Sequence, residues 1–184
     1  MKKFVLIKFA SLAVAGLLSQ GAFAIDGTIN FTGEITTQAC SVSPSSQNLI
    51  VPLGKVSTNV FGGIPATIGA MSTPAKFTID LLGCDTTTIK NASVSFSGTS
   101  DLDNNTKLRL ANAGQVGVAS ASGVAIEIGD STGAKIDLNT GKSGDYILGQ
   151  GDNSLKFQAA YIATKNVVTP GPANAAAQFT IAYK

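Results

Sequence analysis

The 184-residue sequence has no histidine, only two cysteines and few charged residues, which make up 13% of the chain. Without histidine, the Ser-His-Asp and Cys-His arrangements of nucleophilic catalysis are excluded, as are the usual zinc ligand sets. Two carboxylates can also act as acid and base, but the only close pair is Asp101 and Asp103. This pair stands beside Asn104-Asn105 in a turn sequence, where we expect solvated acids. We therefore expect no catalytic residue, no metal ion, no cofactor and no enzyme activity.

Long apolar runs are scarce as well, and the one at the start of the chain is short. A basic beginning, Met1-Lys2-Lys3, is followed by ten largely apolar residues, 9–18, and then by Ala22-Phe23-Ala24. Ten residues are too few to span a bilayer, which needs about 20. The order of basic start, apolar run and small residues predicts a secretory signal peptide over residues 1–24, cleaved after Ala24.

Removal of this segment leaves a chain of almost no net charge. Three of the 13 basic residues, Lys2, Lys3 and Lys8, lie in the signal, so ten remain against 11 acidic ones. A near-neutral chain without a basic cluster argues against nucleic acid or anionic lipid as a partner. Low charge with 44% hydrophobic residues suits a protein whose surface is largely buried against copies of itself.

The two cysteines, Cys40 and Cys84, are predicted to form one intrachain disulfide, because an exported chain folds in an oxidising compartment. Closing a loop of this length stabilises a fold by about 4 kcal/mol in the chain-entropy model. The alternative is a reactive or metal-binding thiol pair, which the lack of histidine disfavours.

Apolar and polar residues alternate with a period of two in short segments bounded by Gly, Asn, Asp and Ser, which predicts β-strands. We expect an antiparallel sandwich over residues 39–184, preceded by an N-terminal extension, residues 25–38. Residues 58–72 are irregular, with room for a loop or one helical turn, and Thr169-Pro170-Gly171-Pro172 breaks the chain before the last strand. The alternating segments are marked by Phe77, Ile79 and Leu81; by Val94 and Phe96; by Leu108 and Leu110; by Val124, Ile126 and Ile128, which a turn joins to Ile136 and Leu138; and by Leu155, Phe157, Ala159, Tyr161 and Ala163.

Both ends of the exported chain carry an amphipathic segment. Residues 25–35 lie before the first cysteine, outside the loop that the disulfide would close, and residues 178–184 end the sequence. Each can be an ordinary outer strand of a complete sandwich. One face of the first segment holds Ile25, Gly27, Ile29, Phe31, Gly33 and Ile35, and one face of the second holds Phe179, Ile181 and Tyr183.

Several motifs resemble those of chaperone–usher pilins, and in particular the major subunits of type 1 fimbriae. Residues 157–164 and 178–184 are similar to the C-terminal region of that family, in which a penultimate Tyr183 accompanies Gly171, fourteenth from the end. The segment Phe31-Thr32-Gly33-Glu34-Ile35, followed by Ala39-Cys40, resembles the N-terminal extension and first cysteine of the family. Gly83-Cys84-Asp85 resembles the segment of the second cysteine. The resemblance covers residues 25–184.

The resemblance implies an incomplete immunoglobulin-like antiparallel sandwich that lacks its last strand and has a hydrophobic groove beside its final strand. A periplasmic chaperone would fill the groove first. At an outer-membrane usher, the N-terminal strand of the next subunit would replace the chaperone by β-strand addition. The implied function is a structural subunit of a fimbria, or pilus, that supports adhesion at the cell surface. The implied partners are copies of itself, other pilins, the chaperone and the usher, with no nucleic acid.

The resemblance also implies roles for single residues. Gly33 would face a shallow part of the groove, and the Lys184 carboxylate would bind the chaperone, while the disulfide would staple two strands. The donor-strand residues are Ile25, Ile29, Phe31, Gly33 and Ile35; the acceptor edge and chaperone-binding residues are Gly171, Phe179, Ile181, Tyr183 and Lys184.

Two alternatives stay open at this point. The chain could be a minor adaptor or tip-fibrillum pilin of the same family, although a terminator would lack the intact donor segment, residues 25–35. It could also be a secreted sandwich domain that binds a small molecule, against which the amphipathic ends count.

Overall fold

The computed structural model describes residues 28–30, 32, 33, 35, 38–113, 115, 117 and 119–184. The predicted signal peptide, residues 1–24, lies outside the described residues, as do Ile25 and Phe31 of the predicted donor strand. The chain divides into two units, Met1–Ile35 and Thr36–Lys184. The described residues of the first unit form no helix or strand, and every element named below belongs to the second.

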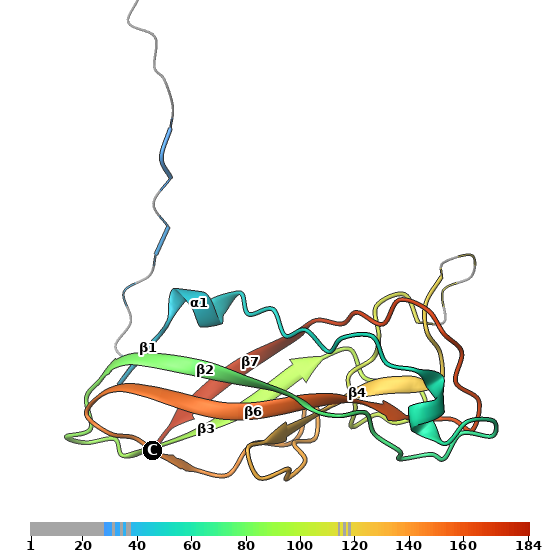
Figure 1. The fold of residues 1–184 in the computed structure, drawn as a ribbon. Coiled ribbons are helices and arrows are strands. Elements are labelled where there is room, and N and C mark those ends of the chain that lie inside the picture. Colours follow the sequence, from blue (N-terminus) through green and yellow to red (C-terminus); the bar gives the residue numbers. More distant parts are fainter. Residues whose placement is uncertain are drawn as a thin grey trace, which may run out of the picture. The chain divides into compact units, whose positions relative to one another are not determined.

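The second unit consists of two antiparallel sheets, as the alternation predicted (Figure 1). The four-stranded sheet has the order β1 (Ser41–Val42), β2 (Ala75–Cys84), β6 (Gly151–Ala163) and β4 (Val124–Asp130). The three-stranded sheet has the order β5 (Tyr146–Ile147), β3 (Asn91–Gly98) and β7 (Ala177–Tyr183). Neighbouring strands pair antiparallel throughout.

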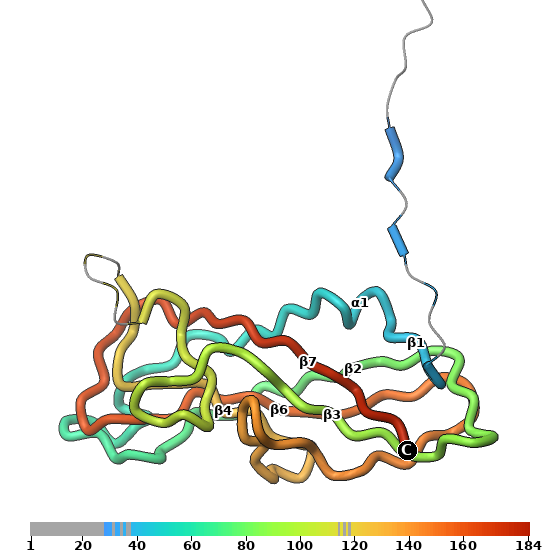
Figure 2. The backbone as a smooth tube through the Cα atoms, turned by 180° about the vertical axis from the view of Figure 1, so that it is seen from behind, coloured from blue at the N-terminus to red at the C-terminus, as the bar shows by residue number. Residues whose placement is uncertain are grey.

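The strand directions distinguish two ends of this unit. At the disulfide end, β2 and β7 finish and β3 and β6 begin, next to the C-terminus marked in Figures 1 and 2. At the loop end lie the 3₁₀ helix η1 (Thr58–Phe61) and residues 62–74. Apart from η1, the described residues hold one short helix, α1 (Pro44–Gln47). Neither helix has the length or the apolar surface to cross a bilayer.

Five of the predicted strands are confirmed as β2, β3, β4, β6 and β7, and two predictions on the shorter segments are corrected. Leu108 forms only isolated bridges, to Ser100 and Ile126, so Leu108 and Leu110 are not in a strand. The segment with Ile136 and Leu138 begins beside β4, where the Ile136 N–H bonds to the Ile128 C=O at 2.9 Å. It then turns away, because the Leu138 N–H bonds to Thr106 at 2.9 Å instead.

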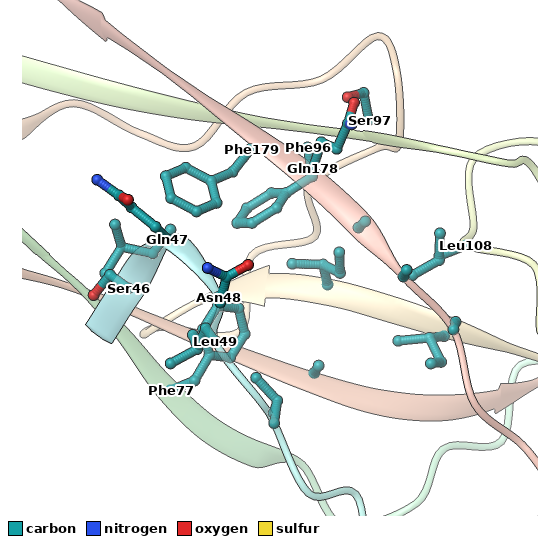
Figure 3. Close-up of a pocket in the computed structure, with 18 of the residues that line it drawn as sticks. Ser46, Gln47, Asn48, Leu49, Phe77, Phe96, Ser97, Leu108, Gln178 and Phe179 are labelled. Atoms are coloured by element: carbon teal, nitrogen blue, oxygen red, sulfur yellow. The ribbon is translucent and has the colours of Figure 1, made fainter. Parts of the chain in front are cut away.

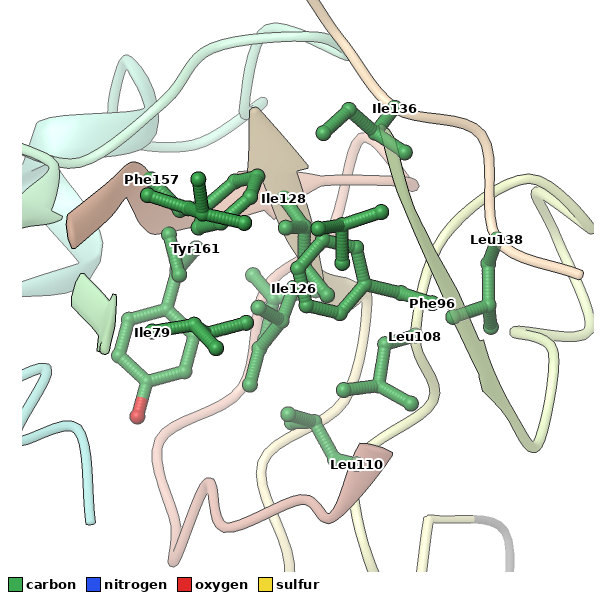
Figure 4. Close-up of a cluster of buried hydrophobic side chains, with 14 of the residues drawn as sticks. Ile79, Phe96, Leu108, Leu110, Ile126, Ile128, Ile136, Leu138, Phe157 and Tyr161 are labelled. Atoms are coloured by element: carbon green, nitrogen blue, oxygen red, sulfur yellow. The ribbon is translucent and has the colours of Figure 1, made fainter. Parts of the chain in front are cut away.

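The core lies between the inner faces of the two sheets, where the alternating apolar residues meet (Figure 4). Phe157 of β6 is fully buried and contacts the rings of Phe77 from its own sheet and Phe96 and Tyr146 from the facing one, at centroid distances of 5.6, 5.3 and 5.6 Å. Aromatic contacts of this kind contribute about 0.5–1.5 kcal/mol each beyond their burial. Phe157 therefore ties the two sheets together at the centre of the sandwich.

A disulfide joins Cys40, just before β1, to Cys84, the last residue of β2, as predicted. The two Cα atoms are 4.1 Å apart, slightly closer than the usual range of about 4.4–6.8 Å. The Asp85 N–H also bonds to the Ala39 C=O at 2.9 Å. The start of the sandwich is thus fixed to the end of β2, and whatever precedes Cys40 leaves from this point.

Candidate functional site

One side of the β7 backbone has no partner among the described residues. At the end of the strand, Lys184 and Asn91 exchange both of their backbone hydrogen bonds, at 2.9 and 3.0 Å. In an antiparallel ladder, bonded residues alternate with residues whose N–H and C=O point the other way. The even-numbered residues of β7 therefore bond to β3. The odd-numbered ones, Phe179, Ile181 and Tyr183, turn their backbone groups toward the open side.

The neighbouring strand β3, in contrast, has hydrogen-bond partners on the side away from β7. The Ser143 N–H bonds to the Val94 C=O at 2.8 Å, and the Asn139 N–H bonds to the Phe96 C=O at 2.9 Å. Buried backbone groups in native proteins are nearly always paired. A row of apolar residues with free backbone groups on β7 is therefore a place where another strand can bind.

Residues 48–56 run along the other side of this opening (Figure 2). After β1, the Ser43 N–H still bonds to Asp80 at 2.9 Å, but Pro44 has no N–H to continue the ladder and begins α1 instead. Beyond α1, the described structure contains no backbone hydrogen bond to residues 48–56. Leu49, Val51 and Leu53 alternate along this segment and line the opening. Both rims of the opening thus have unpaired backbone and apolar side chains.

Between the two rims lies a hollow of about 760 Å³ (Figure 3). Figure 3 shows the rings of Phe96 and Phe179 on one side of it, with Leu49 and Phe77 on the other. The inner face of the four-stranded sheet forms the floor, which would be continuous core if a further strand covered it. The floor residues are Phe77 and Ile79 from β2, Ile126 and Ile128 from β4, and Ala159 from β6.

A second hollow of about 350 Å³ continues the opening toward the loop end. The two hollows meet where Leu53 is followed by Gly54 on one rim and Asn174 by Ala175 on the other. Together they form one groove beside residues 168–180, which include the first part of β7. The second hollow is lined on one side by Gly54, Lys55, Val56, Thr58 and Phe61, and on the other mainly by residues 168–174.

Gly171 belongs to this second hollow and not to β7 itself. A Cβ atom at this position would lie 2.5 Å from the backbone of Ser120 and Ala121. The close approach is held by a hydrogen bond of 2.9 Å from the Ala121 N–H to the Pro172 C=O. The residue therefore has to be glycine so that residues 170–172 can lie against the neighbouring loop and form the groove wall.

Tyr183 ends β7 and Lys184 follows it, beyond Thr180, the last residue of this strand that lines the hollow. Burial raises the pKa of the Tyr183 phenol, and its hydroxyl is buried without a hydrogen-bond partner among the described residues. The Lys184 ammonium bonds to Asp145 at 2.9 Å, and this hydrogen bond raises the pKa of the lysine. A carboxylate oxygen of Lys184 accepts from the N–H groups of Lys90 and Asn91. The last residue is thus bound to the body of the sandwich.

The predicted donor residues that the structure describes are exposed. The side chain of Ile29 is 79% exposed and that of Ile35 is fully exposed. A Cβ atom added to Gly33 would contact nothing within 4 Å, so its small size has no role inside its own unit. Ile25 and Phe31 lie outside the described residues.

Two acids of the described chain, Asp101 and Glu127, are buried with partners of their own. Asp101 was expected to be solvated, but it is buried, and its Oδ1 accepts from the backbone N–H groups of Asp103 and Asn104, each at 3.1 Å. Glu127, also buried, lies 3.3 Å from the ammonium groups of Lys107 and Lys135. The described residues hold no cluster of three or more potential metal ligands. These acids are occupied in holding loops and strands together.

The residues of the second rim were missed by sequence reasoning. Residues 48–56 were not assigned to any element, although Leu49, Val51 and Leu53 alternate with a period of two. Pro52 interrupts the segment, which made a strand prediction unsafe. The segment also has no neighbouring strand in the described chain, and an extended segment without such a partner is not assigned as a strand.

The chain is similar to known proteins over most of its length. The family model described as "Fimbrial protein" matches residues 29–184. The long polar fimbria protein A of Salmonella typhimurium is 39% identical over 184 residues, covering 100% of this chain and 98% of that protein.

Two solved structures are similar as well. The type I fimbria protein and antigen of Burkholderia pseudomallei is 36% identical, with a TM-score of 0.58, over 85% of this chain and 97% of that one. A subunit of a chaperone–usher pilus is 23% identical, with a TM-score of 0.69, over 92% of this chain and 100% of that one. At that identity the second similarity speaks for the fold alone.

Proposed function

The chain belongs to the fimbrial protein family, and on that premise we propose that it polymerises by inserting residues 25–35 of one copy into the groove of the next. It is a structural subunit of a chaperone–usher fimbria, with an incomplete immunoglobulin-like sandwich, and its place is the fimbria on the cell surface. Its relatives are structural fimbrial subunits and not enzymes.

The open edge of β7 is the observation that carries the proposal. Phe179, Ile181 and Tyr183 offer backbone groups on one rim, and residues 48–56 offer them on the other. A strand inserted between the rims forms hydrogen bonds on both sides, and its alternate side chains enter the hollow. The inserted strand would therefore replace the missing strand of the sandwich.

The shape of the groove favours one direction for the inserted strand. The hollow beside β7, of about 760 Å³, is larger than the hollow at the loop end, of about 350 Å³. In the donor segment, Ile29 and Phe31 precede Gly33 and a single large apolar residue, Ile35, follows it. We place Ile29 and Phe31 in the larger hollow and Ile35 in the smaller. The donor then runs antiparallel to β7, the only kind of pairing found among the named strands.

In this register Gly33 falls where the two hollows meet, between Leu53–Gly54 on one rim and Asn174–Ala175 on the other. A side chain here would have no hollow to enter. The smallness of Gly33, which has no purpose in its own unit, is then needed by the acceptor.

Before assembly the groove needs another occupant, because an exposed apolar sheet edge promotes aggregation. We propose that a periplasmic chaperone fills it along Phe179, Ile181 and Tyr183, with Gly171 shaping one wall and Lys184 at the end of the contact. An outer-membrane usher then brings donor and acceptor together. Export through the periplasm requires the signal peptide predicted over residues 1–24.

The test is to delete residues 25–35 and look for filaments. Bacteria lacking their own copy of the gene would be given either the full chain or the deleted chain and viewed by electron microscopy. We expect filaments only with the full chain, while the deleted subunit is still recovered with its groove filled by the chaperone. Filaments of normal number in the absence of the gene would make the chain a minor subunit. Filaments formed by the deleted chain would refute donor-strand insertion.

A further inference from the structure

Four exposed apolar side chains gather at the loop end, and we call them the apolar loop patch: Val60, Ile64, Ile68 and Val167. Ile64 is 94% exposed. Single exposed apolar residues are ordinary on a protein surface, but a group of them marks a contact site. These four side chains remain exposed in the described chain, so a contact that buries them has to come from outside it.

Hydrogen bonds hold the patch in shape. The Ala66 N–H bonds to the Asn166 C=O at 2.7 Å, and the Gly69 N–H bonds to the Ala163 C=O at 2.8 Å. Between them, the Thr67 N–H bonds to the Phe61 C=O at 2.7 Å. These bonds fasten the loop of Ile64 and Ile68 against the end of β6 and the residues that follow it. The apolar side chains are therefore presented on a fixed surface.

The patch adjoins the smaller hollow of the groove. Phe61 and Val168 line that hollow, and each is next in sequence to a patch residue, Val60 and Val167. The groove mouth and the patch are thus two parts of the same end of the sandwich.

The short covalent link between the donor strand and the body of its own subunit limits how far that body can lie from this end. In the register proposed above, on which this inference rests, Ile35 of the donor lies in the smaller hollow. Only residues 36–39 separate it from Cys40, which is fixed in the body of its own subunit by the disulfide. Five residue steps reach at most about 17 Å. The body of the donor subunit must therefore lie within this distance of the groove mouth, where the patch is.

We propose that the apolar loop patch binds the disulfide end of the subunit that donates its strand. That end has exposed apolar side chains of its own, Leu82 and Ile147. Leu82 pairs with Ser41 in β1, immediately after Cys40, and Ile147 pairs with Asn91 at the start of β3. The contact is head-to-tail, with different surfaces on the two copies, and a contact of this kind continues into a filament when its rotation does not close a ring.

The contact does a different job from the inserted strand. Four side chains cover too little area to hold two proteins together alone. Once the strand is inserted, the two subunits are already joined. The contact of the patch then forms within one assembly and carries no further association cost. The patch therefore sets the angle between consecutive subunits and resists bending, while the strand holds them together.

A cross-linking experiment identifies the occupant. Ile64→Cys, labelled with a benzophenone maleimide, would be assembled into filaments and irradiated, and cross-linked peptides would be sequenced by mass spectrometry. We expect cross-links to residues 38–42, 82–90 or 145–152 of another copy. Leu102→Cys is the matched control, because Leu102 is 76% exposed, lies outside the patch and lines neither hollow of the groove. We expect its label to give none of these cross-links.

Other outcomes overturn the inference. Cross-links from Ile64→Cys to another copy's residues 60–71, or to a different protein, would assign the patch to lateral association or to another partner. Filaments without cross-links would show the patch to be unoccupied. In each case filaments exist and strand insertion stands, whereas failure of the full chain to form filaments would remove the proposed function and this inference together.

A second variant tests the mechanical role without labelling. Ile64→Ser with Ile68→Ser should leave filament number unchanged but shorten the persistence length measured from electron micrographs. Leu102→Ser should leave the persistence length unchanged, because Leu102 is exposed but belongs neither to the patch nor to the groove. Equal persistence lengths in the three proteins would contradict the inference.

Discussion

Two glycines decide how closely backbones approach each other around the groove. Gly171 is required inside its own sandwich, where a Cβ atom would strike the backbone of Ser120 and Ala121. Gly33 has open space around it in its own unit, so a requirement for its smallness must come from another molecule. The two residues look alike in the sequence and differ only in where their missing side chain would go.

Replacing Gly33 with leucine should block polymerisation and leave the fold of the subunit intact. The added side chain meets the narrow junction of the two hollows in the acceptor but nothing in its own unit. Filaments would be counted by electron microscopy, and the mutant would be recovered from the periplasm in complex with the chaperone. Thr32→Leu is the control, because its side chain points to the other face of an extended donor strand. Wild-type filament numbers with Gly33→Leu would show that the glycine is placed wrongly.

Loss of the disulfide should destabilise the sandwich. Cys40→Ser opens a cross-link between residues 44 apart, and we expect the free energy of unfolding to fall by about 4 kcal/mol in the chain-entropy model. Urea unfolding of a subunit with a filled groove measures this loss. The double replacement of Cys40 and Cys84 should cost about the same as the single one. A loss below about 1 kcal/mol would mean that the unfolded chain gains little freedom when the cross-link is removed.

At the scale of the element, β7 is paired on one side only. Its apolar side chains alternate as in any strand with one face on a core, and its even-numbered residues bond to β3. Nothing in this pattern distinguishes an edge strand from a central one, because alternation reports burial of a face and not the state of the backbone groups. The short β1 produces the opening: Pro44 ends its pairing with β2, and the chain that follows runs on as an unpaired rim.

Hydrogen exchange should detect the unpaired half of β7. In a chain lacking residues 1–35, the N–H groups of Phe179, Ile181 and Tyr183 should exchange faster than those of Thr180 and Ala182, which bond to β3. A synthetic peptide of residues 25–35 should slow exchange at the three odd-numbered positions. Exchange would be followed by NMR, residue by residue. Equal protection of odd and even positions before the peptide is added would refute an open edge.

At the scale of the whole molecule, the protein is a sandwich whose core is left open along one groove. The apolar floor formed by β2, β4 and β6 faces a hollow of about 760 Å³, so part of the burial that stabilises such a fold is missing. In the proposed assembly, a strand from another copy supplies that burial. Folding and polymerisation are therefore driven by the same apolar contacts.

Supplying the strand within one chain should convert the protein into a stable monomer. Residues 25–35 would be fused after Lys184 through a short turn, so that the added strand returns antiparallel to β7. Burial of Ile29, Phe31 and Ile35 contributes about 1.5–3 kcal/mol each, and no association entropy is lost. The fusion should fold without the chaperone and melt well above the chain without it, as measured by calorimetry and light scattering.

Replacing those three residues by serine in the fused segment is the control, and it should remove the gain. If the chain without residues 25–35 is already a stable monomer and the fusion leaves its melting temperature unchanged, the groove has no need of a strand.

The sequence by itself determined the class of fold, the main strands and the cysteine pair, because alternation and export depend on local residue types. It also indicated both amphipathic ends, through residues 25–35 and Phe179, Ile181 and Tyr183. Only the tertiary structure decided that β7 is an edge, that residues 48–56 form the second rim, and that Gly171 serves packing. These features depend on which segments lie side by side and which backbone groups stay unpaired. That is a property of contacts distant in sequence, which no local pattern of residues records.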